Sequence, residues 1–125
     1  MKENIIKIVI NKPIAKVFEF STNPQNTHLW FESIKEEIAS EYPPRIGTIY
    51  KNRGADATKW NRVVVSNLIP NELFELAGDN YGVRYTYRQV ADGTELTYHE
   101  WATNGELNGV TQQSVLDKLK KIMEI

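Results

Sequence analysis

Hydrophobic residues follow two spacings along this chain. Between residues 6 and 10 every second position is an isoleucine, which is typical of a half-buried β-strand. Alternation of hydrophobic and polar residues returns near Ile34. It continues to Glu100 in short segments that end at proline, glycine or asparagine. Helical spacing occurs only between these two regions and at the C-terminus. The pattern predicts an α+β chain in which one strand and two short helices precede a curved antiparallel sheet of about seven strands in total.

Two start signals follow the first strand. Asn11 is expected to cap a helix that carries Pro13 in its first turn, where a missing N–H costs nothing. Asn23-Pro24 repeats the signal and predicts a second helix of about two turns that ends near Trp30. The two helices are therefore expected to change the direction of the chain between the first strand and the rest of the sheet.

The rest of the chain up to residue 100 is predicted to be strands. We expect them near residues 34–38, 48–51, 60–68, 73–76, 83–88 and 95–100. Residues 52–57 are predicted to form a turn in which Gly54 and Asp56 adopt the permissive backbone conformations. Asp92-Gly93 is the strongest hairpin signal, and it should pair the last two strands.

A long helix is predicted from about Asn108 to the C-terminus. Val115, Leu119 and Ile122 lie on one face of it, and lysines follow near its end. Its apolar stripe must be buried, and the sheet is the only large surface available. We expect the helix to pack across the sheet.

Composition limits the functions that need to be considered. The chain has 125 residues and a net charge of -1, which suits one domain over residues 1–125 and gives no field that attracts nucleic acid. It contains no cysteine, so disulfides and thiolate sites are excluded. We find no targeting segment and no apolar run long enough for membrane insertion, so we expect a cytoplasmic protein.

The order of elements resembles the helix-grip fold of the START-like (SRPBCC) superfamily, and within it the small bacterial members of the polyketide cyclase/dehydrase type. The residues that carry the resemblance are Pro13, Val17 to Phe20, Asn23-Pro24, Trp30-Phe31, Gly47, Val65 to Pro70 and Asp92 to Tyr98. These motifs specify shape more than chemistry. The resemblance implies a cavity between the sheet and the C-terminal helix for a small hydrophobic or amphipathic molecule.

Three tyrosines are candidates for the wall of that cavity. Tyr85, Tyr87 and Tyr98 lie on strand faces that the hairpin should bring together, and their phenols would offer polar groups on an apolar surface. The alternative is that they are core aromatics beneath the last helix. Trp30 has the same two interpretations, and we favour packing between helix and sheet for it. Leu119 is expected on the helix side of the cavity.

Two carboxylates continue inward-facing patterns. Glu100 extends the face of Leu96 and Tyr98, and Glu36 lies between Ile34 and Ile38. A buried carboxylate has a raised pKa and can act as a general acid or base. Glu100 is the best catalytic candidate, whereas Glu36 is expected to be a surface charge.

No other chemical motif is present. The two histidines, His28 and His99, lie in separate elements, and His99 falls on the polar face of its strand, so no metal site is expected. There is no nucleophile elbow and no phosphate-binding glycine loop. No cofactor is implied.

Three functions remain open. The first is binding of a small hydrophobic or amphipathic ligand, for which the predicted ligand-binding residues are Trp30, Tyr85, Tyr87, Tyr98, Glu100 and Leu119. The second is an enzyme of the cyclase or dehydratase type that moves a proton with a pocket carboxylate or tyrosine. The third is a protein-interaction module similar to co-chaperone START-like domains. We favour the first, because it requires only the cavity.

Overall fold

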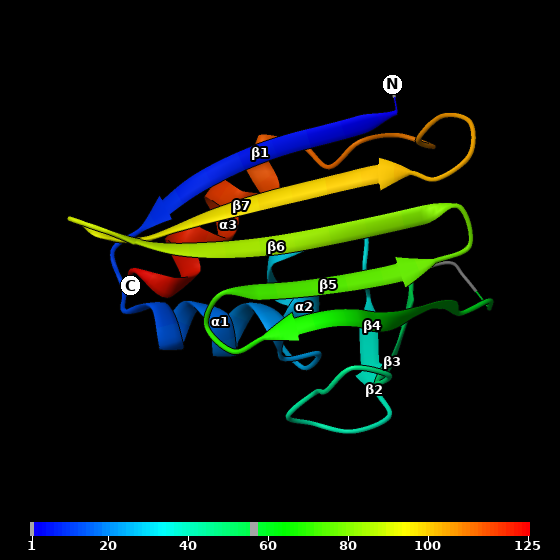
Figure 1. Ribbon diagram of the computed structural model, residues 1–125, viewed down its shortest axis with the longest axis horizontal. Helices are drawn as coiled ribbons and strands as arrows, with labels where there is room; N and C mark the ends of the chain where they lie inside the picture. The colour runs from blue at the N-terminus through cyan, green and yellow to red at the C-terminus, as the bar shows by residue number, and fades with distance from the viewer. Residues whose placement is uncertain (1, 56–57) are drawn as a thin grey trace.

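A computed structural model describes residues 2–55 and 58–125 of the chain (Figure 1). Its elements are β1 (Glu3–Ile10), α1 (Ile14–Thr22), α2 (Thr27–Trp30), β2 (Glu36–Ala39), β3 (Ile49–Arg53), β4 (Asn61–Ile69), β5 (Leu73–Gly78), β6 (Tyr81–Val90), β7 (Gly93–Ala102) and α3 (Gln113–Met123). The strands form one antiparallel sheet in the order β1-β7-β6-β5-β4-β3-β2. The helices lie on one side of this curved sheet (Figure 1). The predicted α+β class and helix-grip arrangement are confirmed.

β6 and β7 form the predicted hairpin, but its loop lies one residue before the predicted Asp92-Gly93. Val90 pairs with Gly93, so Ala91 and Asp92 make the two-residue loop. Gly93 has a φ of 133°, and a side chain there would collide with the carbonyl oxygen of Ile10. The turn sets the register that places Tyr85 directly opposite Tyr98.

α3 packs against the sheet near its β1 edge. The apolar stripe of α3 is buried. Leu116 and Leu119 are both 0% exposed. The helix begins at Gln113 and not near Asn108. Gly105 and Gly109 have φ values of 81° and 97°, which an α-helix cannot contain, so the preceding segment is a loop. Among the described residues, no helix combines the length and apolar character needed to cross a bilayer.

The predicted roles of Asn11 and Asn23-Pro24 in starting the two short helices are wrong. Pro13, not Asn11, is the N-cap of α1, and it makes no side-chain capping bond. The backbone N–H of Asn11 instead donates to Glu124 Oε2 at 2.7 Å. Asn23 accepts the N–H of Gln25 in a turn, which delays α2 until Thr27 and reduces it to four residues.

The inward face of β2 also differs from the prediction. Glu37 and Ala39 lie opposite Asn52 and Tyr50 on the inner face, while Ile38 is 46% exposed. The isoleucine spacing suggested the opposite face. The side of an edge strand that faces inward is decided by its pairing with β3 as well as by its own pattern.

The turn between β3 and β4 was predicted partly from Gly54. The φ of Gly54 is not in the positive range. A larger residue is instead disfavoured there because its Cβ would lie 3.3 Å from the carbonyl oxygen of Ser33. Asp56 lies outside the described residues.

Candidate functional site

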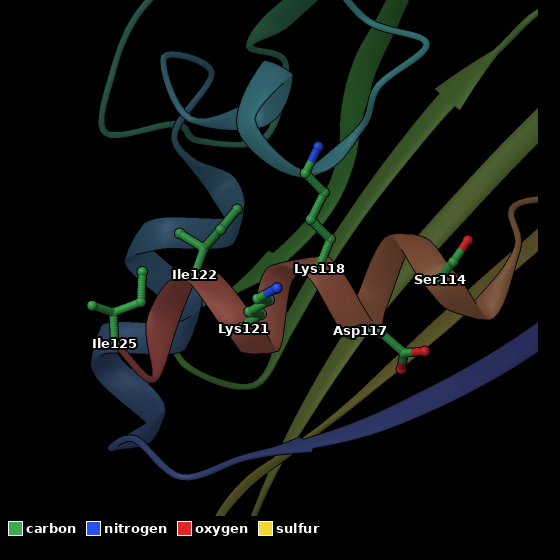
Figure 2. Close-up of a pocket in the computed structure, with 6 residues that line it drawn as sticks. All are labelled: Ser114, Asp117, Lys118, Lys121, Ile122 and Ile125. Atoms are coloured by element: carbon green, nitrogen blue, oxygen red, sulfur yellow. The ribbon is translucent and has the colours of Figure 1, made fainter.

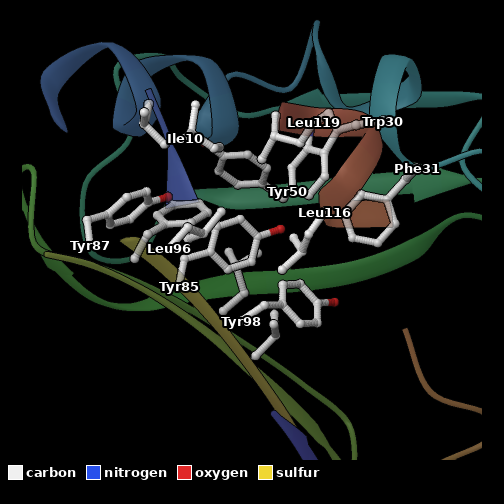
Figure 3. Close-up of a cluster of buried hydrophobic side chains, with 14 of the residues drawn as sticks. Ile10, Trp30, Phe31, Tyr50, Tyr85, Tyr87, Leu96, Tyr98, Leu116 and Leu119 are labelled. Carbon is white, nitrogen blue, oxygen red and sulfur yellow. The ribbon is translucent and has the colours of Figure 1, made fainter. Parts of the chain in front are cut away.

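Four aromatic side chains form a closed group on the inner side of the sheet. The ring centroids lie 4.5 Å apart for Trp30 and Phe31, 6.1 Å for Phe31 and Tyr98, 5.3 Å for Tyr98 and Tyr85, and 6.1 Å for Tyr85 and Trp30. We call these four residues the aromatic quartet. Two members come from the end of α2 and two from the paired strands β6 and β7. Together with Leu116 and Leu119, these residues occupy the space in which a cavity was expected (Figure 3).

The aromatic quartet contains polar atoms that bond to no other residue described by the structure. Trp30 is 0% exposed, and its indole Nε1 has no hydrogen-bond partner among the described residues. The hydroxyl of Tyr85 likewise has none there, whereas that of Tyr98 accepts a bond from Thr111 Oγ1 at 3.2 Å. In Figure 3 the hydroxyls of Tyr85 and Tyr98 both point towards the side where Phe31 lies. Buried polar atoms without partners are rare, so this region has unused hydrogen-bonding capacity.

The tyrosines of the aromatic quartet are held in their neutral form. Burial, with the neighbouring Glu100 second, raises the pKa of Tyr98 to about 12. Burial also raises the pKa of Tyr85 well above its ordinary value, with contributions from Tyr98 and Glu37. A phenol in this state donates a hydrogen bond and cannot act as a base near neutral pH.

Glu37 is a partly buried carboxylate on the inner face of β2. Its Oε1 accepts a bond from Thr27 Oγ1 at 2.6 Å, and its Oε2 accepts a longer one from Asn52 Nδ2 at 3.3 Å. Loss of hydration outweighs these two bonds and raises the pKa of Glu37 above its ordinary value. The charge of Glu37 contributes to the raised pKa of Tyr85 and Tyr98, so this carboxylate lies within electrostatic range of the aromatic quartet.

Glu100 is more deeply enclosed, at 3% exposure. Its Oε2 accepts bonds from Asn4 Nδ2 at 2.9 Å and from the backbone N–H of Thr111 at 2.7 Å. Its Oε1 accepts a bond from the hydroxyl of Tyr81 at 3.0 Å. These donors come from β1, β6 and the loop before α3. Glu100 therefore ties that loop to the sheet.

The remaining predicted ligand-binding residues belong to the packed core. The hydroxyl of Tyr87 lies 2.7 Å from Ser21 Oγ, and its ring packs edge-on against Phe18. Leu119 is fully buried on α3. Glu36, in contrast, points outward and pairs with Arg53 at 2.9 Å, as expected for a surface charge.

Two hollows on the surface lie away from the aromatic quartet. One is an open groove of about 500 Å³ on the outer side of α3, lined by Ser114, Asp117, Lys118, Lys121, Ile122 and Ile125. Figure 2 shows that Ile122 and Ile125 lie beside α1 at one end of this groove and Ser114 lies at the other. The second hollow, of about 460 Å³, lies between β2 and β3 and is lined by residues 40–41 and 45–48. Neither is lined by a residue of the predicted site.

No cluster of metal-ligating side chains occurs within residues 2–55 and 58–125. His99 lies on the outer face, where its Nε2 is 3.5 Å from Glu3 Oε1 without making a hydrogen bond. Its ring is adjacent to that of Trp101 at 5.0 Å.

Sequence reasoning missed two residues of this region. Phe31 was noted only as part of a motif, although it closes the aromatic quartet and is 9% exposed at its edge. The alternation of Ile34, Glu36 and Ile38 with Lys35 and Glu37 predicts that Glu37 faces outward, whereas it faces inward. The signal that could have identified Glu37 is its position next to Glu36, because one of two adjacent strand residues must face inward.

Comparison with known proteins identifies the fold alone. No family model matches the sequence, and no curated protein matches it at a significant level. Among solved structures, the chain is similar to protein MLL2253 from Mesorhizobium loti, with a TM-score of 0.76, 14% identity, and coverage of 98% of this chain and 97% of that one.

Two further solved structures show the same likeness over nearly their whole length. Protein CV1439 from Chromobacterium violaceum has a TM-score of 0.72 at 14% identity, with coverage of 100% and 99%. The Aha1 dimer from Colwellia psychrerythraea has a TM-score of 0.71 at 18% identity, with coverage of 100% and 98%. At these identities the likeness establishes a small bacterial α+β fold shared with these proteins.

Proposed function

We propose that this protein binds a small amphipathic molecule at the aromatic quartet. The observation that carries the proposal is the buried Trp30 indole N–H, which has no partner among the described residues. The Tyr85 hydroxyl, on a ring whose centroid is 6.1 Å from that of Trp30, also makes no bond to them. A ligand with an apolar, preferably aromatic, body would pack against Phe31 and Tyr98. Its hydroxyl or carbonyl group would accept bonds from the two neutral donors.

Entry to this site requires movement of α2 and the segment after it. α2 is a single turn of four residues, too short to be stable on its own. The segment after Phe31 is joined to α3 by an exposed ion pair between Glu32 and Lys118 at 3.1 Å. Exposed ion pairs contribute little to stability. The main cost of moving Phe31 outward is therefore the loss of its packing against Trp30 and Tyr98, whose ring centroids lie 4.5 Å and 6.1 Å from its own.

The resemblance to START-like proteins agrees with ligand binding and also suggests two alternatives. An enzyme of the cyclase type that uses Glu100 is less favoured, because three donors of the protein already occupy that carboxylate. A protein-interaction role is suggested by the likeness to an Aha1 dimer. The buried Trp30 indole N–H without a partner among the described residues favours a small ligand, since a surface interaction would not need it.

The test compares two probes that differ by one hydroxyl. We expect 2-naphthol to raise the melting temperature of the wild-type protein more than naphthalene does, because only 2-naphthol can bond to Tyr85 or Trp30. Tyr85→Phe should reduce the difference between the probes, because only the Trp30 indole N–H then remains as a donor. The matched control is Tyr42→Phe, which removes an exposed hydroxyl that bonds to the Glu19 carbonyl oxygen.

Two results would contradict the proposal. The first is that neither probe shifts the melting temperature of the wild-type protein. The second is that Tyr85→Phe keeps the full preference for 2-naphthol. Chemical-shift changes on the ring protons of Phe31 and Tyr98 would locate the probe independently of stability.

A further inference from the structure

β1 is an edge strand, and half of its free edge is open. The carbonyl oxygen of Lys2 accepts the N–H of Ala102, so the even-numbered residues of β1 bond to β7 and the odd-numbered ones direct their N–H and C=O groups outward. In Figure 1 this free edge lies along the rim of the sheet, away from β7. Exposed edges of this kind are templates for pairing with another strand.

α3 covers the C-terminal half of that edge. Gln113 Nε2 donates to the carbonyl oxygen of Lys7 at 2.8 Å, and Lys120 Nζ donates to that of Val9 at 2.6 Å. Just beyond the strand, Glu124 accepts the N–H of Asn11. Among the described residues, no group bonds in this way to the outward N–H and C=O groups of Glu3 and Ile5. The open part of the edge is therefore its first half.

The side chains of this open half are self-complementary. Ile5, 51% exposed, lies midway between an acidic residue, Glu3, and a basic one, Lys7. If two copies of β1 pair in antiparallel fashion about Ile5, the two isoleucines meet and each Glu3 lies opposite the Lys7 of the other copy. All of these residues are odd-numbered, so their outward backbone groups are in register to bond.

We infer that this protein forms a homodimer through antiparallel pairing of β1 with β1 of a second copy, centred on Ile5. Opposite charges in directly opposed positions stabilise such pairs and select this register. Two existing contacts compete with it. The Gln113 side chain must leave the Lys7 carbonyl oxygen for the pairing to be complete, and Glu3 must turn from His99, 3.5 Å away. The Gln113 bond is exposed and the His99–Glu3 contact is long, so breaking them costs little.

The other edge of the sheet lacks this complementarity. β2 is four residues long, and its charged residues, Glu36 and Glu37, are both acidic. Pairing between two copies of β2 would gain no ion pair, and Glu36 is already bonded to Arg53. The charge pattern therefore selects β1.

Sedimentation equilibrium of charge variants tests the inference. Wild-type protein should show concentration-dependent dimerisation that weakens with added salt. Glu3→Lys and Lys7→Glu should each raise the dimer dissociation constant by about tenfold, because both opposed pairs become repulsive. An equimolar mixture of these two variants should form a heterodimer, since every opposed pair is again attractive. The double variant Glu3→Lys/Lys7→Glu should recover the wild-type constant.

The outcomes separate clearly. A wild-type protein that stays monomeric at every accessible concentration overturns the inference. Dimerisation that neither single variant weakens also overturns it, because the interface must then lie elsewhere. Circular dichroism of each variant confirms that the exposed substitutions leave the fold intact, and recovery in the mixture excludes misfolding as the cause of dissociation.

Discussion

The inner face of the sheet carries two carboxylates that differ in how fully the protein occupies them. Glu100 accepts three bonds from three separate segments. Glu37 accepts two, one of them long, and desolvation dominates its environment. The residue that looked catalytic from the sequence is held by donors of the protein itself. Glu37, which the strand pattern places on the outer face, instead faces inward, and its charge contributes to the raised pKa of Tyr85.

An inward-facing side chain alone therefore does not identify a functional carboxylate. A charge that is satisfied by fixed donors holds its segments together, as Glu100 holds the loop before α3. A charge with unused acceptor capacity costs stability in the free protein and can be compensated by a ligand. Glu37 fits the second description.

The largest expected effect concerns the packed region beneath α3. Leu119→Ala should destabilise the protein by about 2–5 kcal/mol, because it empties a fully buried position. Urea denaturation measures the change, and exposed Lys121→Ala on the same helix is the control. A cost below about 1 kcal/mol would mean that α3 stands over empty space, and the aromatic quartet would then border a cavity.

Next, Glu100→Ala should cost about 2–4 kcal/mol, because it leaves the Asn4 amide, the Thr111 N–H and the Tyr81 hydroxyl without their acceptor. Amide exchange of the loop before α3 should accelerate as well. Glu95→Ala on the outer face of the same strand removes only a pair with exposed Arg88 and is the matched control. Equal costs for the two variants would remove the structural role assigned to Glu100.

Glu37→Gln should have a smaller effect that depends on pH. Because the pKa of Glu37 is raised in the folded protein, folding favours the protonated form, and the associated stability is lost as pH rises above the ordinary value of 4.5. The variant should therefore melt higher than wild type at pH 8, and the advantage should vanish towards pH 4. Melting curves at both values test this, with Glu36→Gln as the exposed neighbour. A variant that is less stable than wild type at pH 8 would show that the ionised carboxylate is favourable.

The smallest effect is expected at Tyr85. Tyr85→Phe removes a hydroxyl without a partner and should change stability by less than about 0.5 kcal/mol. Tyr87→Phe should cost about 0.5–1.5 kcal/mol, because it breaks the bond to Ser21. A large loss in Tyr85→Phe would reveal a partner for its hydroxyl and weaken the proposed binding site.

Local patterns predicted the parts of the site that depend on nearby residues. The Asp92-Gly93 signal predicts that β6 and β7 form a hairpin. It does not predict the register, because a two-residue loop at Asp92-Gly93 would place Tyr87 opposite Tyr98, whereas the observed loop at Ala91-Asp92 pairs Tyr85 with Tyr98. The stripe that includes Leu119 predicts which face of α3 is buried. Both features arise from spacings within a few residues. The start of α3 was misplaced because the left-handed conformations of Gly105 and Gly109 carry no periodic signal.

Sequence patterns predict the order of strands and helices, the β6–β7 hairpin and the amphipathic last helix, because side-chain periodicity and turn chemistry act locally. The inward direction of Glu37 and the three bonds that Glu100 accepts are known only from the tertiary structure. The same holds for the donors of the aromatic quartet that have no partner among the described residues. These properties depend on pairing and on donors far apart in the chain, such as Asn4 and Thr111 around Glu100, and no local pattern records which distant groups meet.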